Sequence, residues 1–365
     1  MSALKDIYSP VFYDKLSAIL DRALPEFDKI RFMSRIYRDG FEHKELKDRM
    51  RHTAKAMHCF MPEDFNETVP VLQHIIKHLR EATIGEDSLA YMFLPDYIET
   101  YGINNYDAAI KALEFTTQFT SCEFAVRPFL LQYPDQMMDQ MKAWSLHENH
   151  KVRRLASEGS RPRLPWAMAI PYLKKDPTAV LPLLENLKND PSEWVRRSVA
   201  NNINDIAKDN PGVVIELAKQ WKGSSKETDA IIKHGCRTLL KQAHPEVLRI
   251  YGLDSTHMIL SNFEIITPTV KMGDSVEFTF MIENRDSTPQ TVRLEYGLYY
   301  KKSKGHLARK VFKISERIFQ PGEKSTIVRK QSFRPITTRV FYPGDHELSL
   351  IVNGEEKSIA KFELI

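Results

Sequence analysis

Two stretches of this sequence repeat one another: HKVRRLA at residues 150–156 and EWVRRSVA at residues 193–200. They lie about 43 residues apart, a period typical of HEAT-like pairs of helices. A third, weaker copy, IKH, follows at residues 232–234. Around these copies, apolar residues recur at the three- and four-residue spacing of helices from Pro10 to about Tyr251. The sequence therefore predicts an all-α, HEAT-like solenoid of stacked helix pairs.

The periodicity changes from helical to alternating between residues 253 and 261. Beyond that point, apolar residues occupy every second position at 276–282 and again at 292–300, which is typical of strands. Turn signals separate such runs, and Asn353-Gly354 is the strongest because this pair favours a two-residue hairpin. About seven short strands fit an all-β, immunoglobulin-like sandwich. All cysteines precede this region, so the sandwich would have no inter-sheet disulfide.

The chain has 365 residues, which is long for a single hydrophobic core, so two domains are expected. The change of periodicity divides it into a HEAT-like helical domain at residues 1–254 and an immunoglobulin-like domain at residues 255–365. The predicted fold class is therefore multidomain, with an all-α solenoid followed by an all-β sandwich.

The composition indicates a soluble protein of the cell interior. The sequence has no run of about 18 apolar residues and no charged-then-apolar leader, so neither membrane insertion nor secretion is expected. Cys59, Cys122 and Cys236 show no C-x-x-C spacing and no nearby histidine pattern, which argues against a disulfide framework and a zinc site. We expect buried thiols in a reducing cytoplasm and no metal. The net charge of +4 is mild, but the basic residues cluster, which favours nucleic-acid binding.

The clearest candidate for a functional site is ASEGSRPRLPW at residues 156–166, because this stretch interrupts the helical repeat. Gly159, Pro162 and Pro165 disfavour regular helix, so the sequence predicts a basic loop here. The stretch carries one carboxylate, one aromatic ring and two guanidinium groups: Glu158, Trp166, Arg161 and Arg163. Such a mixture suits a cationic substrate that is flanked by phosphates.

The arginines of the V-R-R phrases are expected to line one face of the solenoid, because the phrases recur in phase. A curved basic face matches the width of a nucleic-acid duplex better than a pocket does. Arginines at such positions can equally form salt bridges between neighbouring repeats, and this alternative stays open.

Four phrases along the helical region resemble the AlkC branch of the AlkC and AlkD alkylpurine DNA glycosylases. They are LKDRMRH at 46–52, EFAVRPF at 123–129, the stretch at 156–166, and HGCRTLL at 234–240. Some AlkC-like proteins also carry a C-terminal immunoglobulin-like domain, and this sequence looks like that longer form. The resemblance implies hydrolytic release of cationic alkylated bases, 3-methyladenine and 3-methylcytosine, from duplex DNA without base flipping, as the first step of base excision repair. The balance among these bases and 7-methylguanine stays open.

The resemblance also implies how the enzyme works. It would act as a cytoplasmic monomer, associated with the nucleoid through DNA, and hydrolysis needs no cofactor. A base methylated on a ring nitrogen is positively charged and leaves the sugar as a neutral molecule, so no strong general acid is required. The remaining task is to stabilise an oxocarbenium-like sugar and to present water to it, which carboxylates can do.

The residues that match the family's active site are Glu158 and Glu123, two acidic positions that would share charge stabilisation and water positioning. The question of which acid holds the water in position stays open. Trp166 is expected to hold its ring against the cationic lesion or its sugar. The expected DNA contacts are Arg154, Arg161, Arg163, Arg196, Arg197 and Arg237, with Lys302 and Lys304 in a basic turn of the second domain.

A non-catalytic HEAT-repeat adaptor that binds protein or nucleic acid is the alternative. Taken alone, Glu158 is typical of a solvated carboxylate at a helix end, and Glu123 of an acid favoured by a helix dipole. Trp194 is expected in the core, whereas Pro165 and the arginines favour an exposed Trp166. The loop separates the two hypotheses, because an adaptor has no need to interrupt a repeat helix with so many reactive groups.

Overall fold

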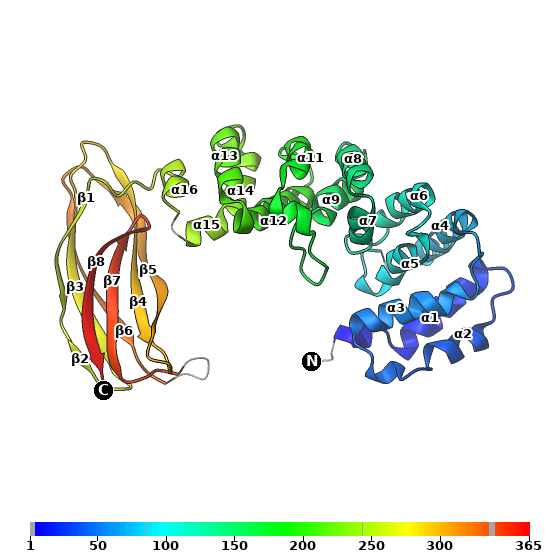
Figure 1. Cartoon of the computed structure of the whole chain (residues 1–365), viewed down its shortest axis with the longest axis horizontal. Helices are drawn as coiled ribbons and strands as arrows, with labels where there is room; N and C mark the ends of the chain where they lie inside the picture. The colour runs from blue at the N-terminus through cyan, green and yellow to red at the C-terminus, as the bar shows by residue number, and fades with distance from the viewer. Residues whose placement is uncertain (1–3, 85, 243, 336–339) are drawn as a thin grey trace. The chain divides into compact units, whose positions relative to one another are not determined.

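The computed structural model describes residues 4–84, 86–242, 244–335 and 340–365 (Figure 1). Helices extend from the N-terminal region to Ile250, and strands follow from Met258 onward. The change from helix to strand therefore falls where the sequence predicted it. The chain packs as two compact units, one of Met1–Val214 with Trp221–Gly235 and one of Ile215–Gln220 with Cys236–Ile365. The domain boundary that the sequence placed between residues 254 and 255 stays a prediction.

The helical region consists of short helices, most of which pack against helices one to three places away along the chain (Figure 1). Its first α-helices are α1 (Pro10–Ala23), α2 (Lys29–Ile36), α3 (Leu46–His58), α4 (Phe65–Glu81), α5 (Phe93–Gly102), α6 (Tyr106–Thr117), α7 (Val126–Gln132) and α8 (Pro134–Trp144). The later ones are α9 (His150–Gly159), α10 (Pro171–Lys175), α11 (Leu181–Leu187), α12 (Glu193–Asp209), α13 (Pro211–Trp221), α14 (Lys226–Gly235), α15 (Arg237–Lys241) and α16 (Pro245–Ile250). Short 3-10 helices are η1 (Leu4–Ile7), η2 (Phe41–His43), η3 (Leu89–Met92) and η4 (Thr178–Val180).

The repeated V-R-R phrases occupy equivalent places in α9 and α12, as the periodicity predicted. Val152 and Val195 are both fully buried near the starts of these helices. The Asn149 side chain accepts a hydrogen bond from the Lys151 N–H at 2.9 Å and so caps α9. Because α12 packs against both α9 and α14, it forms the centre of the repeat.

Helix α9 is longer than the sequence predicted, and this corrects the expected start of the loop. The helix continues through Glu158 to Gly159, and the irregular segment follows at residues 160–170. A Cβ at Gly159 would lie only 2.6 Å from Cγ2 of Val126 and 3.2 Å from Cε of Met141. The glycine therefore lets α9 approach α7 and α8 closely. This packing offsets the cost of glycine in a helix, which is about 1 kcal/mol relative to alanine. Glu158 consequently lies in α9 and not in the loop.

The C-terminal region is a sandwich of two sheets. Its strands are β1 (Met258–Ile265), β2 (Thr269–Val270), β3 (Ser275–Asn284), β4 (Gln290–Lys301), β5 (Leu307–Phe319), β6 (Lys324–Ser332), β7 (Gly344–Val352) and β8 (Glu355–Leu364). One sheet has the order β1-β3-β6 and the other β2-β8-β7-β4-β5. In the described residues, the two-residue strand β2 brings the count to one more than the seven expected.

The two sheets share a single apolar core, which explains the alternating sequence pattern. Every second residue of β3, from Val276 to Ile282, is buried, and Phe278 meets Tyr296 of the other sheet at 5.2 Å between ring centroids. The predicted hairpin joins β7 to β8, with Asn353 and Gly354 at φ of 46° and 79°. Both angles are positive, as a type I′ turn requires, and Asn and Gly tolerate them.

The cysteines are free thiols. Cys122 and Cys236 are buried as expected, and burial raises the pKa of the Cys236 thiol to about 11. The expectation of burial is wrong for Cys59, which is exposed at the end of α3. Within the described residues, no group of three or more potential ligands is placed to hold a metal ion.

None of the helices in the described part of the chain is both long enough and apolar enough to span a bilayer.

Candidate active site

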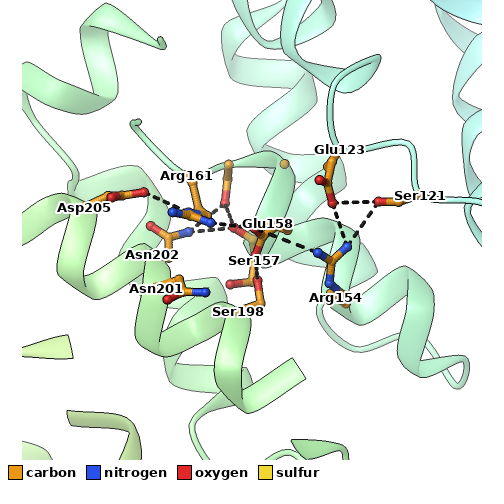
Figure 2. Close-up of polar contacts among 12 residues, drawn as sticks. Ser121, Glu123, Arg154, Ser157, Glu158, Arg161, Ser198, Asn201, Asn202 and Asp205 are labelled. Atoms are coloured by element: carbon orange, nitrogen blue, oxygen red, sulfur yellow. Dashed lines mark hydrogen bonds and ion pairs between the residues drawn. The ribbon is translucent and has the colours of Figure 1, made fainter. Parts of the chain in front are cut away.

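The centre of the candidate site is the Glu158 carboxylate, which α9 directs toward α12 (Figure 2). Its Oε1 accepts a hydrogen bond from Nη1 of Arg161 at 2.6 Å, and its Oε2 accepts one from Oγ of Ser198 at 2.6 Å. The residue is 6% exposed. A carboxylate so deeply buried needs hydrogen-bond donors to replace water, and here an arginine and a hydroxyl provide them. Glu158 is thus a structured element of the site rather than a solvated helix-end acid.

Arg161 is held between two carboxylates from successive repeats. In addition to Glu158, its Nε donates to Oδ2 of Asp205 on α12 at 2.8 Å. Lys208 also donates to Asp205 at 2.8 Å. The sequence placed Arg161 among the phosphate contacts, but its guanidinium is buried, so a phosphate could be bound only if these ion pairs broke.

The second carboxylate, Glu123, lies in the turn just before α7. Its Oε2 accepts hydrogen bonds from Oγ of Ser121 and from Nη1 of Arg154, both at 2.8 Å. Its Oε1 accepts no hydrogen bond from the described residues, and the side chain is 17% exposed. Unlike Glu158, Glu123 therefore has an oxygen available for a water molecule or a ligand.

Arg154 joins the two carboxylates (Figure 2). Its Nη1 is bonded to Glu123, and its Nη2 lies 3.9 Å from Oε1 of Glu158. The guanidinium also lies 4.4 Å from the centroid of the Trp194 ring. The expectation that Trp194 lies in the core is wrong, because 39% of the residue is exposed. One arginine thus lies between both predicted catalytic acids and over a partly exposed aromatic ring.

Trp166 is presented to solvent by the irregular segment 160–170. The residue is 65% exposed, and its φ of 62° lies in the left-handed region. A bulky residue in this conformation costs about 1–3 kcal/mol and persists only where the surroundings impose it. The backbone around Trp166 is therefore held by other contacts.

One of these contacts comes from inside the protein. Arg127, on α7, is fully buried and donates to three carbonyl oxygens: Gly159 at 2.9 Å, Arg161 at 2.8 Å and Met168 at 2.5 Å. No carboxylate of the described residues lies within ion-pairing distance of it. Burial lowers its pKa to about 10, so it remains a cation at neutral pH. Arg127 thereby fastens both ends of the segment to the helix that follows Glu123.

The remaining arginines that the sequence predicted as DNA contacts differ in whether their side chains already have partners within the protein. Arg163 forms a bidentate ion pair with Asp209 at 2.6 and 2.7 Å, and Arg196 donates to the carbonyls of Asp190 and Pro191. Arg197 makes no hydrogen bond or ion pair with the described residues and lines a hollow beside Lys226. Of the predicted helical arginines, Arg197 is accordingly the best placed to meet an outside anion.

Three predicted contacts belong to the second compact unit. Arg237 is half-buried at the start of α15. Lys302 and Lys304 lie in the turn between β4 and β5, as predicted, and Lys304 is exposed.

Sequence reasoning missed the partners of the site, namely Ser198, Asp205, Trp194 and Arg127. The first three lie about one repeat, 40 to 44 residues, beyond the groups that they contact, as in the pairs Glu158–Ser198 and Arg161–Asp205. The period of about 43 residues could therefore have identified them, because equivalent positions of adjacent repeats stack side by side.

Comparison with known proteins identifies similar sequences and structures. The family described as "Uncharacterised protein YhaZ, C-terminal Ig-like domain" matches residues 259–365. The chain is 41% identical over 366 residues to "Uncharacterized protein YhaZ" of Bacillus subtilis (strain 168), with 100% of both chains covered. It is also similar to the solved structure of Pseudomonas fluorescens alkylpurine DNA glycosylase AlkC bound to DNA containing an abasic site analog. That alignment has 34% identity and a TM-score of 0.83, and it covers 100% of this chain and 99% of the other.

Proposed function

Because this chain belongs to the AlkC-type alkylpurine DNA glycosylases, in the long form with an immunoglobulin-like domain, we propose that it releases cationic alkylated bases from duplex DNA. The substrates that we propose are 3-methyladenine and 3-methylcytosine. The protein would act as a monomer in the cytoplasm, without a cofactor, and initiate base excision repair. The observation that carries the proposal is the pair Glu123 and Glu158, bridged by Arg154 in a chain similar to AlkC over its whole length.

The proposed reaction is hydrolysis of the N-glycosidic bond. As the bond from C1′ to the base nitrogen breaks, its electron pair neutralises the positive charge of the base. The sugar becomes oxocarbenium-like, and a water oxygen then bonds to C1′ while its proton passes to a carboxylate. Carboxylates stabilise such a sugar cation and activate water, as they do in glycoside hydrolysis.

The geometry favours a division of labour between the two acids. Both oxygens of Glu158 are occupied by Arg161 and Ser198, so we assign to it the negative charge that stabilises the sugar and positions Arg154. Glu123 has an oxygen without a partner in the described residues, so we assign to it the contact with the attacking water. The contacts of each acid support this division, because a carboxylate that takes a proton from water needs a free lone pair.

Trp166 supports action without base flipping. An exposed ring on the surface of the segment can contact a lesion that stays in the duplex, and its electron-rich face attracts a cationic base. We propose that this contact selects charged lesions over normal bases.

The direct test is incubation of the protein with methylated duplex DNA, followed by chromatography of the freed bases and electrophoresis of the strands. The proposal predicts that 3-methyladenine and 3-methylcytosine are found in the soluble fraction. It also predicts abasic strands that stay uncut unless alkali is added. DNA that is bound but releases no base would favour the adaptor hypothesis instead.

Trp166→Ala is expected to slow release of 3-methyladenine by about 2- to 30-fold, since a cation–ring attraction contributes about 0.5–2 kcal/mol. Trp166→Phe, which keeps an aromatic face, should lose less. Single-turnover rates measure both variants. Affinity for DNA that contains an abasic site should stay within about threefold, and an equally large loss of this affinity would remove the cation–ring explanation.

A double substitution, Lys302→Glu with Lys304→Glu, is expected to weaken binding to undamaged duplex and to flatten its dependence on salt. Each cation that neutralises a phosphate contributes about 0.9 to the slope of log affinity against log salt. Titrations at several salt concentrations measure this slope. A matched double change at other exposed lysines of the sandwich region, Lys271→Glu with Lys361→Glu, should have a smaller effect; equal effects would mean that the turn has no special role.

A further inference from the structure

Lys47, on α3, contacts both segments that carry the proposed reactive groups. Its Nζ donates a hydrogen bond to the carbonyl oxygen of Trp166. The same ammonium group lies 4.5 Å from the centroid of the Phe124 ring, next in sequence to Glu123. A single cation thus connects the turn before α7 with the tip of the segment 160–170, which are more than one helix apart in the chain.

Lys47 contacts the backbone at Trp166, the residue of the segment whose φ is unfavourable. Trp166 has a left-handed backbone although it is bulky and exposed. Within the segment, the N–H of Ala167 donates to the carbonyl of Leu164, and that of Ile170 donates to the carbonyl of Pro162. Arg127 holds the two ends. Lys47 supplies the side-chain contact at the Trp166 carbonyl itself.

Packing does not replace this contact. Ala167 and Met168 line a cavity of about 280 Å³, together with Lys47, Phe124 and residues of α3 and α5. The flank of the segment beyond Trp166 therefore borders open space instead of a close-packed surface. Loss of the ammonium group would leave the Trp166 peptide without its anchor at the edge of this cavity.

We propose that Lys47 is a positioning residue, which fixes the Trp166 ring relative to Glu123 by holding the Trp166 carbonyl beside Phe124. The inference rests on the proposed glycosylase function for its effect on catalysis. The phrase LKDRMRH at 46–52 is one of the four that resemble the family, but it has no part in the carboxylate network. The proposal gives a role to its Lys47. A competing role for an exposed lysine in a DNA-binding protein is neutralisation of a phosphate.

The first arm of the test measures the segment without DNA. Chymotrypsin cleaves after Trp166 once this stretch opens, and the rate of cleavage follows the population of the open form. Lys47→Met is expected to accelerate this cleavage at least about fivefold. Lys47→Arg, which keeps a donor, should restore most of the protection. Lys55 is an exposed lysine two turns further along α3, and its variant Lys55→Met is the control. Chymotrypsin should cleave this control at the wild-type rate.

The second arm measures catalysis and binding separately. Lys47→Met is expected to lower the single-turnover rate of 3-methyladenine release about tenfold, with DNA affinity and its salt slope within about twofold of wild type. Weaker binding with a flatter salt slope and unchanged cleavage after Trp166 would overturn the proposal in favour of a phosphate contact. Unchanged cleavage and unchanged rate would also overturn it. If the wild type releases no base, the proposed function fails, and the protease arm alone still decides whether Lys47 holds the segment.

Discussion

Glu123→Gln is expected to lower the single-turnover rate of 3-methyladenine release by about 100-fold, a barrier increase of about 2.7 kcal/mol. The amide keeps an oxygen that can accept the hydrogen bonds of Ser121 and Arg154, so the turn before α7 should keep its structure. It cannot, however, take a proton from water. The loss should therefore appear in the chemical step rather than in binding.

Quenched single-turnover reactions with methylated duplex measure this rate, and titration with DNA that contains an abasic site measures binding. Glu148→Gln is a suitable control, because this exposed acid lies in the turn between α8 and α9 and has no side-chain partner in the described residues. Release by Glu123→Gln at the wild-type rate would falsify the assignment of water positioning to Glu123.

Glu158→Gln is expected to lower release of 3-methyladenine by at least about tenfold, or about 1.4 kcal/mol, while DNA binding is largely kept. The physical reason is charge. Glu158 brings a negative charge to a buried position beside Arg154 and Arg161, and glutamine of nearly the same shape removes it. A developing sugar cation nearby would lose its electrostatic stabilisation.

The fold should tolerate this change. The amide oxygen of glutamine can accept from Arg161, and its NH₂ group can donate to the Ser198 hydroxyl, which also accepts hydrogen bonds. Arg161 keeps its second carboxylate, Asp205. Ser198→Ala is the companion variant, since it removes a hydrogen bond but leaves the charge, and it should lose much less activity. Losses of equal size in the two variants would show that the network acts through structure and not through charge.

Much of the architecture could be predicted from the sequence because it follows from local periodicity. The positions of Val152 and Val195 in two related phrases indicated stacked helix pairs, and alternation from Val276 to Ile282 indicated a strand buried on one side. Asn353-Gly354 predicted its hairpin correctly because the φ angles of a type I′ turn are demanding. Each of these features depends on residues close together in the chain.

What could not be predicted depends on contacts between distant residues. Propensity placed a break at Gly159, whereas close approach to Val126 keeps this residue helical. The core interpretation of Trp194 was wrong because its ring covers Arg154 instead of filling the interior. The sequence pattern assigned no role to Arg127 by itself, and only the fold shows it buried among three carbonyls. The two acids were found as candidates, but their connection through Arg154 required the structure.

The polar contacts that α12 makes with Glu158 and Arg161 also limit how this helical array can evolve. Solenoids commonly gain and lose length by duplication or deletion of whole repeats. Here Glu158 and Arg161 depend on Ser198 and Asp205 in the adjoining repeat. An extra repeat inserted between the two helices would separate these partners, so that the buried pair Glu158–Arg161 would lose its contacts with Ser198 and Asp205. We therefore expect that repeats can be gained or lost more readily at positions outside this junction.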